Sequence, residues 1–240
     1  MEKVVYILWQ PPAEDLADWC AKLRGRVSEQ ILATGAQGLQ VNVSDNDVAT
    51  AMLRLTSFDT PIMAVVSVWV DTVAGSMRST VEQLLDSASA VLAGYLVTES
   101  VPMAVPPRSL GARAEGFSNF AFLRRPDEFA PDAWLDRWQN HHTKVAIETQ
   151  DTFGYVQNVV VRAVTPNAPP IDGIVEELFR AEALGDVHAF YGSGGDNAEL
   201  ARRLHLMMDS VATFGGERIL DVVPTSRYVL RAPGMSEHER

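Results

Sequence analysis

Two halves of this sequence carry the same order of strand and helix patterns, and this repetition restricts the fold more than any other feature. Each half begins with a short apolar strand, continues with a helix, two strands and a second helix, and closes with a strand. The strands of the first half are predicted at residues 4–9, 39–43, 62–70 and 95–101. Those of the second half are predicted at residues 120–123, 154–161, 174–179 and 219–223 with 228–230.

Short capping motifs predict where two of the helices begin. Ser79 and Glu82 have the spacing of a capping box, and apolar residues at helical spacing follow them up to Gly94, which suits the end of a helix. Asp196 and Glu199 have the same spacing ahead of the last amphipathic stretch. We therefore expect one helix after each motif.

The order β-α-β-β-α-β is typical of ferredoxin-like units, in which two helices cover one face of a four-stranded antiparallel sheet. Two such units in one chain can bury their bare sheet faces against each other. We therefore predict an α+β fold in which two ferredoxin-like repeats form a single pseudo-dimeric α+β barrel. The predicted first repeat spans residues 1–101, a linker rich in proline and glycine spans 102–116, the second repeat spans 117–231, and a mobile tail spans 232–240.

Composition excludes several classes of protein. With 240 residues, of which 47% are hydrophobic and 21% charged, the chain can form a sizeable core. A net charge of -11 would repel nucleic acids and anionic membrane surfaces. The single cysteine, Cys20, forms no intrachain disulfide, and neither a signal peptide nor a membrane span is evident. We expect a cytoplasmic protein whose partners are neither nucleic acids nor membranes.

Four short segments of the second half resemble, in order, the motifs of one known family. They are Phe122 to Pro126, the helix from Trp134 to His142, Gly154 to Asn158, and Asp172 to Glu176. On these residues the second half, from about 117 to 231, resembles the EthD family, a branch of the dimeric α+β barrel superfamily. Members usually form the barrel from two chains. The resemblance therefore implies a fused pair of repeats whose first half has diverged.

The first half differs from the second at one position that bears on chemistry. When the two tryptophan-containing helices are aligned from Trp19 and Trp134, Val27 falls at the place of His142. If the histidine is functional, only the second half retains the chemistry.

The resemblance implies a function only coarsely, because the superfamily includes cofactor-independent monooxygenases, polyketide cyclases and dehydratases, lactone isomerases and haem proteins. The first hypothesis is a small-molecule enzyme, a lyase or an isomerase. It would use no cofactor for dehydration, cyclisation or isomerisation of an apolar aromatic or polyketide-like substrate. The second hypothesis is a non-catalytic protein that binds such a molecule. The third is a haem-binding or oxygenase-type member of the superfamily.

His142 is the first candidate for catalysis. It shares a helical face with Trp134 and Trp138, which places the imidazole among aromatic side chains rather than in bulk water. Histidine is the side chain best suited to moving protons near neutral pH. The alternative is a buried histidine that is hydrogen-bonded to the backbone.

Glu176 is the candidate partner of His142. Alternation along the strand places Glu176 on one face and Glu177 on the other, so one of them shares a face with apolar neighbours. A carboxylate buried there needs a partner, and pairing with Glu176 would orient His142 as a general base. The alternative is a glutamate at the rim that pairs with an arginine.

The strand at residues 154–161 supplies further candidates. Tyr155, the third catalytic candidate, could donate a hydrogen bond to a developing enolate. Gln157, on the same face, and Asn158, on the other, could bind a substrate oxygen. Together with Trp134 and Trp138, which could line an aromatic pocket, they form the predicted substrate contacts. The alternatives are structural hydrogen bonds and plain core packing.

The other histidines lack the spacing of metal ligands, so we predict no metal site. The first hypothesis needs no cofactor, and haem enters only with the third. A fused barrel could be a monomer, although an exposed strand edge would allow a homodimer.

Overall fold

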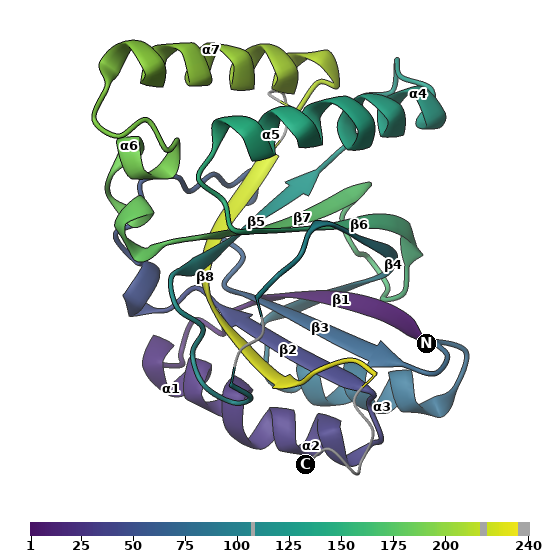
Figure 1. Ribbon diagram of the computed structural model, residues 1–240. Coiled ribbons are helices and arrows are strands. Elements are labelled where there is room, and N and C mark those ends of the chain that lie inside the picture. Colours follow the sequence, from purple (N-terminus) through teal and green to yellow (C-terminus); the bar gives the residue numbers. More distant parts are fainter. Residues whose placement is uncertain (107–108, 217–219, 235–240) are drawn as a thin grey trace.

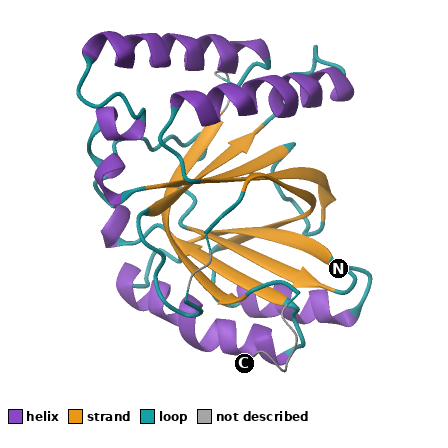
Figure 2. Ribbon diagram, in the orientation of Figure 1, coloured by secondary structure: helices purple, strands orange, loops and turns teal. Residues whose placement is uncertain are grey.

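The fold is a closed barrel of eight antiparallel strands with helices packed against its outside (Figures 1 and 2). It is seen in a computed structural model, which describes residues 1–106, 109–216 and 220–234. The strand order is β1-β3-β2-β8-β5-β7-β6-β4, and β4 pairs with β1 to close the ring. The predicted α+β barrel is therefore confirmed.

The barrel contains two groups of four strands, one from each half of the chain. The first half supplies β1 (Glu2–Trp9), β2 (Gly38–Val43), β3 (Ala64–Val70) and β4 (Val91–Met103). The second half supplies β5 (Phe117–Leu123), β6 (Gly154–Ala163), β7 (Gly173–Phe179) and β8 (Leu220–Arg231). Both groups have the spatial order fourth, first, third, second. They join where β2 pairs with β8 and where β4 pairs with β6.

The helices of the two halves cover opposite sides of the barrel, as Figure 2 shows. The first half supplies α1 (Leu16–Lys22), the π-helical segment η1 (Leu23–Val27), α2 (Ser28–Ala33), the short 3-10 helix η2 (Asn46–Val48) and α3 (Ser76–Asp86). The second half supplies α4 (Pro131–Leu135), the π-helical segment η3 (Asp136–His142), α5 (Thr143–Thr149), the 3-10 helix η4 (Ala181–Leu184), α6 (Val187–Phe190) and α7 (Asn197–Thr213).

Strand alternation divides the apolar residues between the barrel interior and two outer layers. Val5 and Ile7 of β1 lie in the interior with Phe120 and Phe122 of β5. Tyr6, between the two β1 residues, packs on the outside with the helices of the first half. The outer layer of the second half lies between its strands and helices η3 and α7, and this layer contains the candidate site.

Two local predictions for the first half are wrong. Helix α3 begins after Gly75, so Ser79 lies inside the helix rather than capping it. The helix ends at Asp86, and Gly94 lies within β4. Gly94 has a packing role, because a Cβ atom there would lie 2.6 Å from the ring of Tyr6 on the neighbouring strand.

Other boundaries follow the predictions more closely. Asp196 caps α7, because its Oδ1 accepts hydrogen bonds from the backbone N–H groups of Ala198 and Glu199 at 2.8 and 3.2 Å. Strand β4 continues to Met103, two residues into the predicted linker. The two stretches predicted near the end of the chain form one strand, β8. Residues 235–240 of the predicted tail lie outside the described residues.

The closed ring bears on the predicted homodimer. Every described strand has a neighbour on both sides, so the described barrel leaves no free edge for pairing with a second copy. A homodimer formed through another surface stays a prediction. Within the described ranges, no helix combines the length and the hydrophobicity that crossing a membrane requires.

Candidate active site

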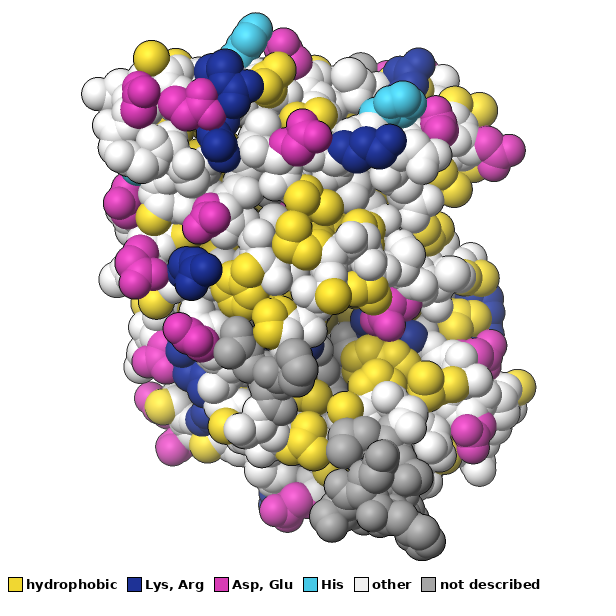
Figure 3. Space-filling model, viewed as in Figure 1, with side chains coloured by type: hydrophobic (Ala, Val, Ile, Leu, Met, Phe, Trp, Pro, Cys, Tyr) yellow, Lys and Arg dark blue, Asp and Glu magenta, His cyan; other side chains and the backbone are white. Residues whose placement is uncertain are grey.

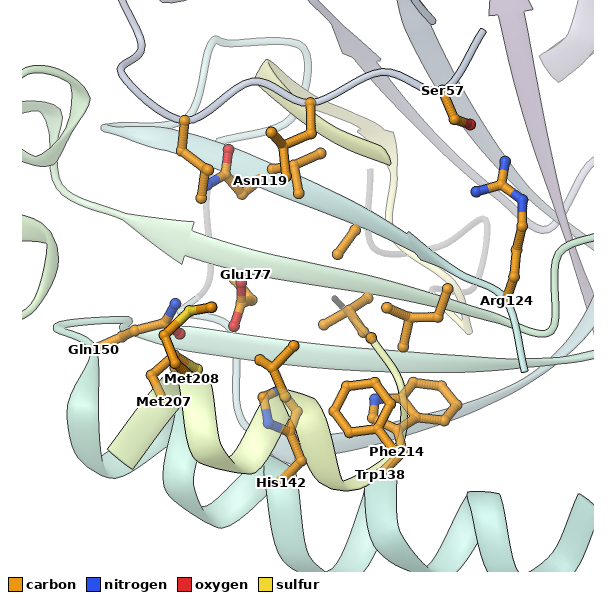
Figure 4. A pocket seen from close by; sticks show the side chains of 18 of the residues that line it. Ser57, Asn119, Arg124, Trp138, His142, Gln150, Glu177, Met207, Met208 and Phe214 are labelled. Carbon is orange, nitrogen blue, oxygen red and sulfur yellow. The ribbon is translucent and has the colours of Figure 1, made fainter. Parts of the chain in front are cut away.

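A cavity of about 820 Å³ lies between the sheet and the helices of the second half (Figure 4). We call it the helix-side cavity. Strands β5 and β7 contribute Asn119 and Glu177, η3 contributes Trp138 and His142, and the residues of α7 and its end complete the helical wall. Most of the remaining lining is apolar, and it includes Val175, Met207, Val211 and Phe214.

His142 reaches this cavity from the end of η3. The side chain is 9% exposed, and its ring packs against Phe214 with 4.7 Å between ring centroids. Nδ1 lies 3.0 Å from the hydroxyl oxygen of Ser210 on α7. Among the described residues, Nε2 has no hydrogen-bond partner. When Nδ1–H donates to Ser210, Nε2 carries the lone pair and can accept a proton.

Burial keeps this imidazole neutral. Removal from water lowers the pKa of His142 from 6.5 to about 4, because the charged ring is poorly solvated there. The ring therefore enters the cavity as a neutral group at physiological pH.

Glu177 is the acidic side chain that faces the same cavity. Figure 4 shows its carboxyl group pointing into the space between the strands and the helices. Burial raises its pKa from 4.5 to about 8, since no described basic side chain offsets the loss of water. The carboxyl group is therefore largely protonated at neutral pH, and it can donate a hydrogen bond.

The predicted contact between Glu176 and His142 is wrong. Glu176 points into the barrel, on the opposite side of β7 from the helices. Its carboxylate accepts hydrogen bonds from Gln40 at 3.0 Å and Ser118 at 2.9 Å, and it forms an ion pair with Arg227 at 3.1 Å. Glu176 therefore pairs with an arginine, as the alternative interpretation expected. The pair lies inside the barrel, however, and not at its rim.

Tyr155 and Trp138, two of the predicted residues, line the helix-side cavity with His142. Burial, reinforced by the neighbouring Glu177, raises the pKa of Tyr155 well above its usual value, so the hydroxyl keeps its proton. The Trp138 ring lies directly over Gly173, where a Cβ atom would come within 2.6 Å of it. This close approach fixes the distance between η3 and β7.

The other three predicted contacts do not line the helix-side cavity. Trp134 lies next to Trp138 and donates its indole N–H to the carbonyl oxygen of Phe214 at 3.1 Å. Gln157 faces the helices but donates a hydrogen bond to the Thr143 hydroxyl. Asn158 points to the other side of β6 and donates to a backbone carbonyl of β7 at 3.2 Å. The geometry favours structural roles for these three side chains.

Sequence reasoning missed several polar groups of the cavity. Asn119 is 2% exposed, and neither its amide oxygen nor that of Gln150 has a hydrogen-bond partner in the described part of the chain. Both residues line the cavity, so both oxygens can accept a hydrogen bond from a ligand. The available signal was alternation, which also places Asn119 on the outer face of β5 and Glu177 on that of β7. The role of Ser210 could not be predicted from local sequence patterns, because its partner His142 is distant in sequence.

A segment from the first half covers one side of the helix-side cavity. Leu55, Ser57 and Phe58 contribute to its lining. Ser57 donates two hydrogen bonds to Asp221, one from its backbone and one from its hydroxyl at 2.9 Å, and Leu55 forms a β-bridge to Val222. The site is therefore built by both halves of the chain.

Asp221 anchors this covering segment from a buried position. Its carboxylate, in addition to the bonds from Ser57, pairs with Arg124 at 2.8 Å. The Arg124 guanidinium lies 5.3 Å from the centre of the Phe58 ring. Arg124 lines the cavity, but Asp221 already neutralises its charge.

Metal ions have no evident site in the described ranges, which hold no group of three or more histidine, cysteine, aspartate or glutamate side chains able to coordinate one.

Comparison with known families confirms the resemblance read from the sequence. Residues 126–214 match the EthD domain, and this segment contains His142, Glu177 and Ser210. A search of the curated proteins finds no match to the chain.

Solved structures of low sequence identity have a similar arrangement. An anthrone oxidase-like protein superposes with a TM-score of 0.51 at 9% identity, covering 98% of this chain and 96% of the other. A proposed monooxygenase from Lactobacillus acidophilus gives 0.49 at 9% identity, with 96% and 97% covered. A mutant chlorite dismutase from Candidatus Nitrospira defluvii gives 0.46 at 10% identity, with 95% and 92% covered. At this identity the first match supports the fold alone.

Proposed function

We propose that this chain is a small-molecule enzyme that removes a proton from carbon next to a carbonyl group, in the helix-side cavity. The observation that carries the proposal is that His142 and Glu177 line the same largely apolar cavity, where burial favours the neutral form of each. A neutral imidazole can accept a proton, and a protonated carboxyl group can donate one.

The chemical step follows from these protonation states. The C–H bond of the substrate breaks, its proton passes to Nε2 of His142, and the electron pair moves to the carbonyl oxygen. Glu177 donates a hydrogen bond to that oxygen. Tyr155 lines the same cavity, with its hydroxyl in contact with Thr143 and Trp138, and would have to exchange one of these contacts to become a second donor. Return of the proton to another carbon gives isomerisation, loss of hydroxide from the adjacent carbon gives dehydration, and attack on a second carbonyl gives cyclisation.

The negative charge that develops on the substrate offsets the cost of charging His142 in apolar surroundings. The empty cavity disfavours a charged imidazole, which is why the pKa of His142 is low. An enolate that forms beside the ring supplies a negative charge and raises the proton affinity of Nε2. The interaction therefore strengthens as the reaction proceeds, as catalysis requires.

The cavity also supports the proposed substrate class. Its size and largely apolar lining suit a flat aromatic or polyketide-like molecule. Asn119 and Gln150 offer free amide oxygens to hydroxyl groups on such a molecule. Ser210 holds the ring of His142 in place, so it is a positioning residue.

An oxygenase-type reaction is the second candidate. A deprotonated aromatic ketone can react with O2, so that a CH2 group becomes a carbonyl and one oxygen atom leaves as water. The same base and cavity would serve, and the anthrone oxidase-like neighbour in fold motivates the comparison. A haem would need His142 as its axial ligand and cations for its propionates. The arginine in the lining, Arg124, is already paired with Asp221, which is a poor fit.

We also interpret the barrel as a fused tandem of two ferredoxin-like repeats, at residues 1–101 and 117–231. The shared strand order of the two groups supports this interpretation. It accounts for a barrel closed by a single chain.

Anthrone in D2O provides the test, because its acidic CH2 group is conjugated with the carbonyl through the aromatic rings. Loss of its proton therefore gives the same enolate type of anion as loss of a proton next to a carbonyl. We expect the protein to accelerate deuterium incorporation at that carbon, as followed by NMR under nitrogen. The variant His142→Val should lose at least about a hundredfold in this rate. His141→Ala removes the exposed neighbouring histidine and should leave the rate unchanged.

The same experiment separates the alternatives. Enzyme-dependent oxygen uptake in air identifies the oxygenase-type reaction. Binding of anthrone without accelerated exchange would support a non-catalytic binding protein and contradict the proposed enzyme. Equal exchange rates in wild type and His142→Val would rule out His142 as the base.

A further inference from the structure

The barrel has a second cavity of about 640 Å³, which we call the barrel-end cavity. It shares no lining residue with the helix-side cavity and lies on the other side of the sheet. Its polar lining comes from Lys3 of β1, Gln40 of β2, Glu99 of β4, Glu176 of β7 and Arg227 of β8. Both halves of the chain therefore contribute to it.

Strand alternation explains why these residues meet at one end of the barrel. Val5 and Ile7 fill the middle of the interior from β1, and Lys3 is the next inward-facing residue toward the start of that strand. Glu176 is the corresponding charged residue on β7, beyond Ile174. The interior thus changes from apolar to charged along its axis.

The acidic groups of this cavity differ in how completely they are bonded. Glu176 is saturated, because Gln40, Ser118 and Arg227 all contact its carboxylate. Arg227 is held by this contact and by a hydrogen bond to the amide oxygen of Gln40 at 2.8 Å. These groups form one connected network inside the barrel, in which Nε of Arg227 has an ion-pair contact with Glu176 but no hydrogen bond to a described residue.

Lys3 is less completely bonded. It is 6% exposed, and its ammonium group contacts Glu99 and lies 4.7 Å from the centre of the Trp69 ring. Glu99 is the more accessible partner, with 29% of its side chain exposed, so it can turn outward and be solvated. Lys3 can then offer its donors to an anion inside the cavity.

The wall around these charges is apolar. The segment after β4 contributes Val105 and Leu110, and the segment after β8 contributes Pro233. Val101 and Leu110 of this wall are half-exposed, at 50% and 48%. Figure 3 shows hydrophobic side chains gathered over the middle of one face of the molecule, beside acidic and basic groups.

We propose that the barrel-end cavity binds an amphiphilic carboxylate, whose carboxylate group contacts Lys3 in place of Glu99 and whose hydrocarbon part lies against the apolar wall. A buried ammonium group favours an anionic partner, and the apolar wall favours a chain or ring of carbon atoms. Glu176 already has an arginine partner, because Arg227 forms an ion pair with it at the same end of the barrel.

Isothermal titration with decanoate, below the concentration at which it forms micelles, tests the proposal. We expect one decanoate to bind per chain, and the uncharged decan-1-ol to bind at least about tenfold more weakly. Lys3→Met keeps the length of the side chain but removes the charge, and it should weaken decanoate binding at least about tenfold. Lys22→Met breaks the Lys22–Glu14 pair on the outside of the molecule and serves as the matched control.

Two more variants locate the bound decanoate. Val101→Trp narrows the mouth of the cavity at a half-exposed position, without touching the ion pair, and should also weaken binding at least about tenfold. His142→Val alters only the helix-side cavity and should bind decanoate as the wild type does. Failure of the wild type to bind decanoate, or undiminished binding by either Lys3→Met or Val101→Trp, would overturn the proposal.

Discussion

The helices that follow β1 and β5 are built alike, although one carries Val27 where the other carries His142. Each contains a π-helical segment, η1 or η3, at the same place. The residue after each segment donates its hydroxyl to the carbonyl five residues earlier: Ser28 to Leu23 at 2.6 Å, and Thr143 to Trp138 at 3.0 Å. A π-helical turn is often found at functional sites, but here it occurs in both halves and is therefore a feature of the fold.

The tryptophans of these helices also have equivalent contacts. Trp19 donates its indole N–H to the carbonyl oxygen of Ala88, just after α3, at 2.6 Å. Trp134 makes the corresponding bond to Phe214, just after α7, at 3.1 Å. Each tryptophan thus holds the end of the second helix of its half.

The two halves differ in what fills the space between sheet and helices. In the first half, Val27 packs in one apolar cluster with Val66 and Val68 of β3. In the second half, His142 and Glu177 face a cavity, and α7 has 17 residues where α3 has 11. The two halves therefore share the spatial order of their strands and the position of a π-helical segment, whereas the cavity with His142 and Glu177 lies on the helix side of the second half.

Exchanging the two equivalent residues should have the largest effect on stability. Val27→His places an imidazole in a packed cluster that has neither a cavity nor a counterpart of Ser210, so we expect a loss of about 3 kcal/mol in the free energy of unfolding. His142→Val should change it by less than about 1 kcal/mol, because the cavity accepts the smaller side chain without strain. Urea unfolding measures both. Equal losses would mean that the two environments do not differ as described.

Glu177→Gln should remove a loss of stability that the wild type shows as the pH rises from about 4.5 to 8. The pKa of Glu177 is about 8 in the folded state and 4.5 in the unfolded chain, so the unfolded chain loses its proton first. Stability therefore falls as the pH rises from about 4.5 to 8. At pH 6 the variant should exceed the wild type by about 2 kcal/mol in the free energy of unfolding. The exposed Glu148→Gln is the control, and a similar gain there would contradict the assignment.

His142 should produce a dependence of stability on acidic pH. Its pKa is about 4 in the folded state and 6.5 in the unfolded chain. Between these pH values the unfolded chain is protonated at His142 and the folded chain is not. Stability is then complete above pH 6.5 and falls as the pH drops toward 4. Between pH 6.5 and 5 the wild type should lose about 1 to 2 kcal/mol more than His142→Val, as chemical unfolding at each pH would show. If the free energy of unfolding changed with pH in the same way in the wild type and in His142→Val, the low pKa of His142 would be refuted.

Ser210→Ala should have the smallest effect. Losing the hydroxyl removes the partner of Nδ1 and should lower the free energy of unfolding by about 1 kcal/mol. If Ser210 positions the ring, the rate of anthrone exchange falls while anthrone affinity is kept. Ser87→Ala, at an exposed position after α3, is the control from the first half. A loss of affinity without a loss of rate would contradict a positioning role.

Much of the fold could be predicted because it depends on local patterns. Apolar alternation predicted the ends of β1, β2 and β7 to within two residues. The capping residue Asp196 predicted the start of α7. The wrong capping prediction at Ser79 has a physical cause. A serine followed three residues later by a glutamate can occur inside a helix as well as at its start. Only tertiary packing determines which of the two positions the motif takes.

The candidate site was predicted in part. Helical spacing placed His142 and Trp138 on the face that lines the cavity. Alternation left the choice between Glu176 and Glu177 open, and the choice of Glu176 was wrong because the barrel interior also accepts a paired carboxylate. The contribution of Ser57 and Asp221 depends on contacts between distant parts of the chain, which local patterns do not contain.

The most direct test of the account is an NMR titration of the histidine side chains, with and without anthrone. We expect His142 to titrate near pH 4, with Nδ1 bonded to Ser210, and anthrone to shift its Nε2 resonance while leaving that of His141 unchanged. A midpoint near 6.5 for His142, with no response to anthrone, would show a solvated ring and contradict the claim that a neutral imidazole faces the helix-side cavity.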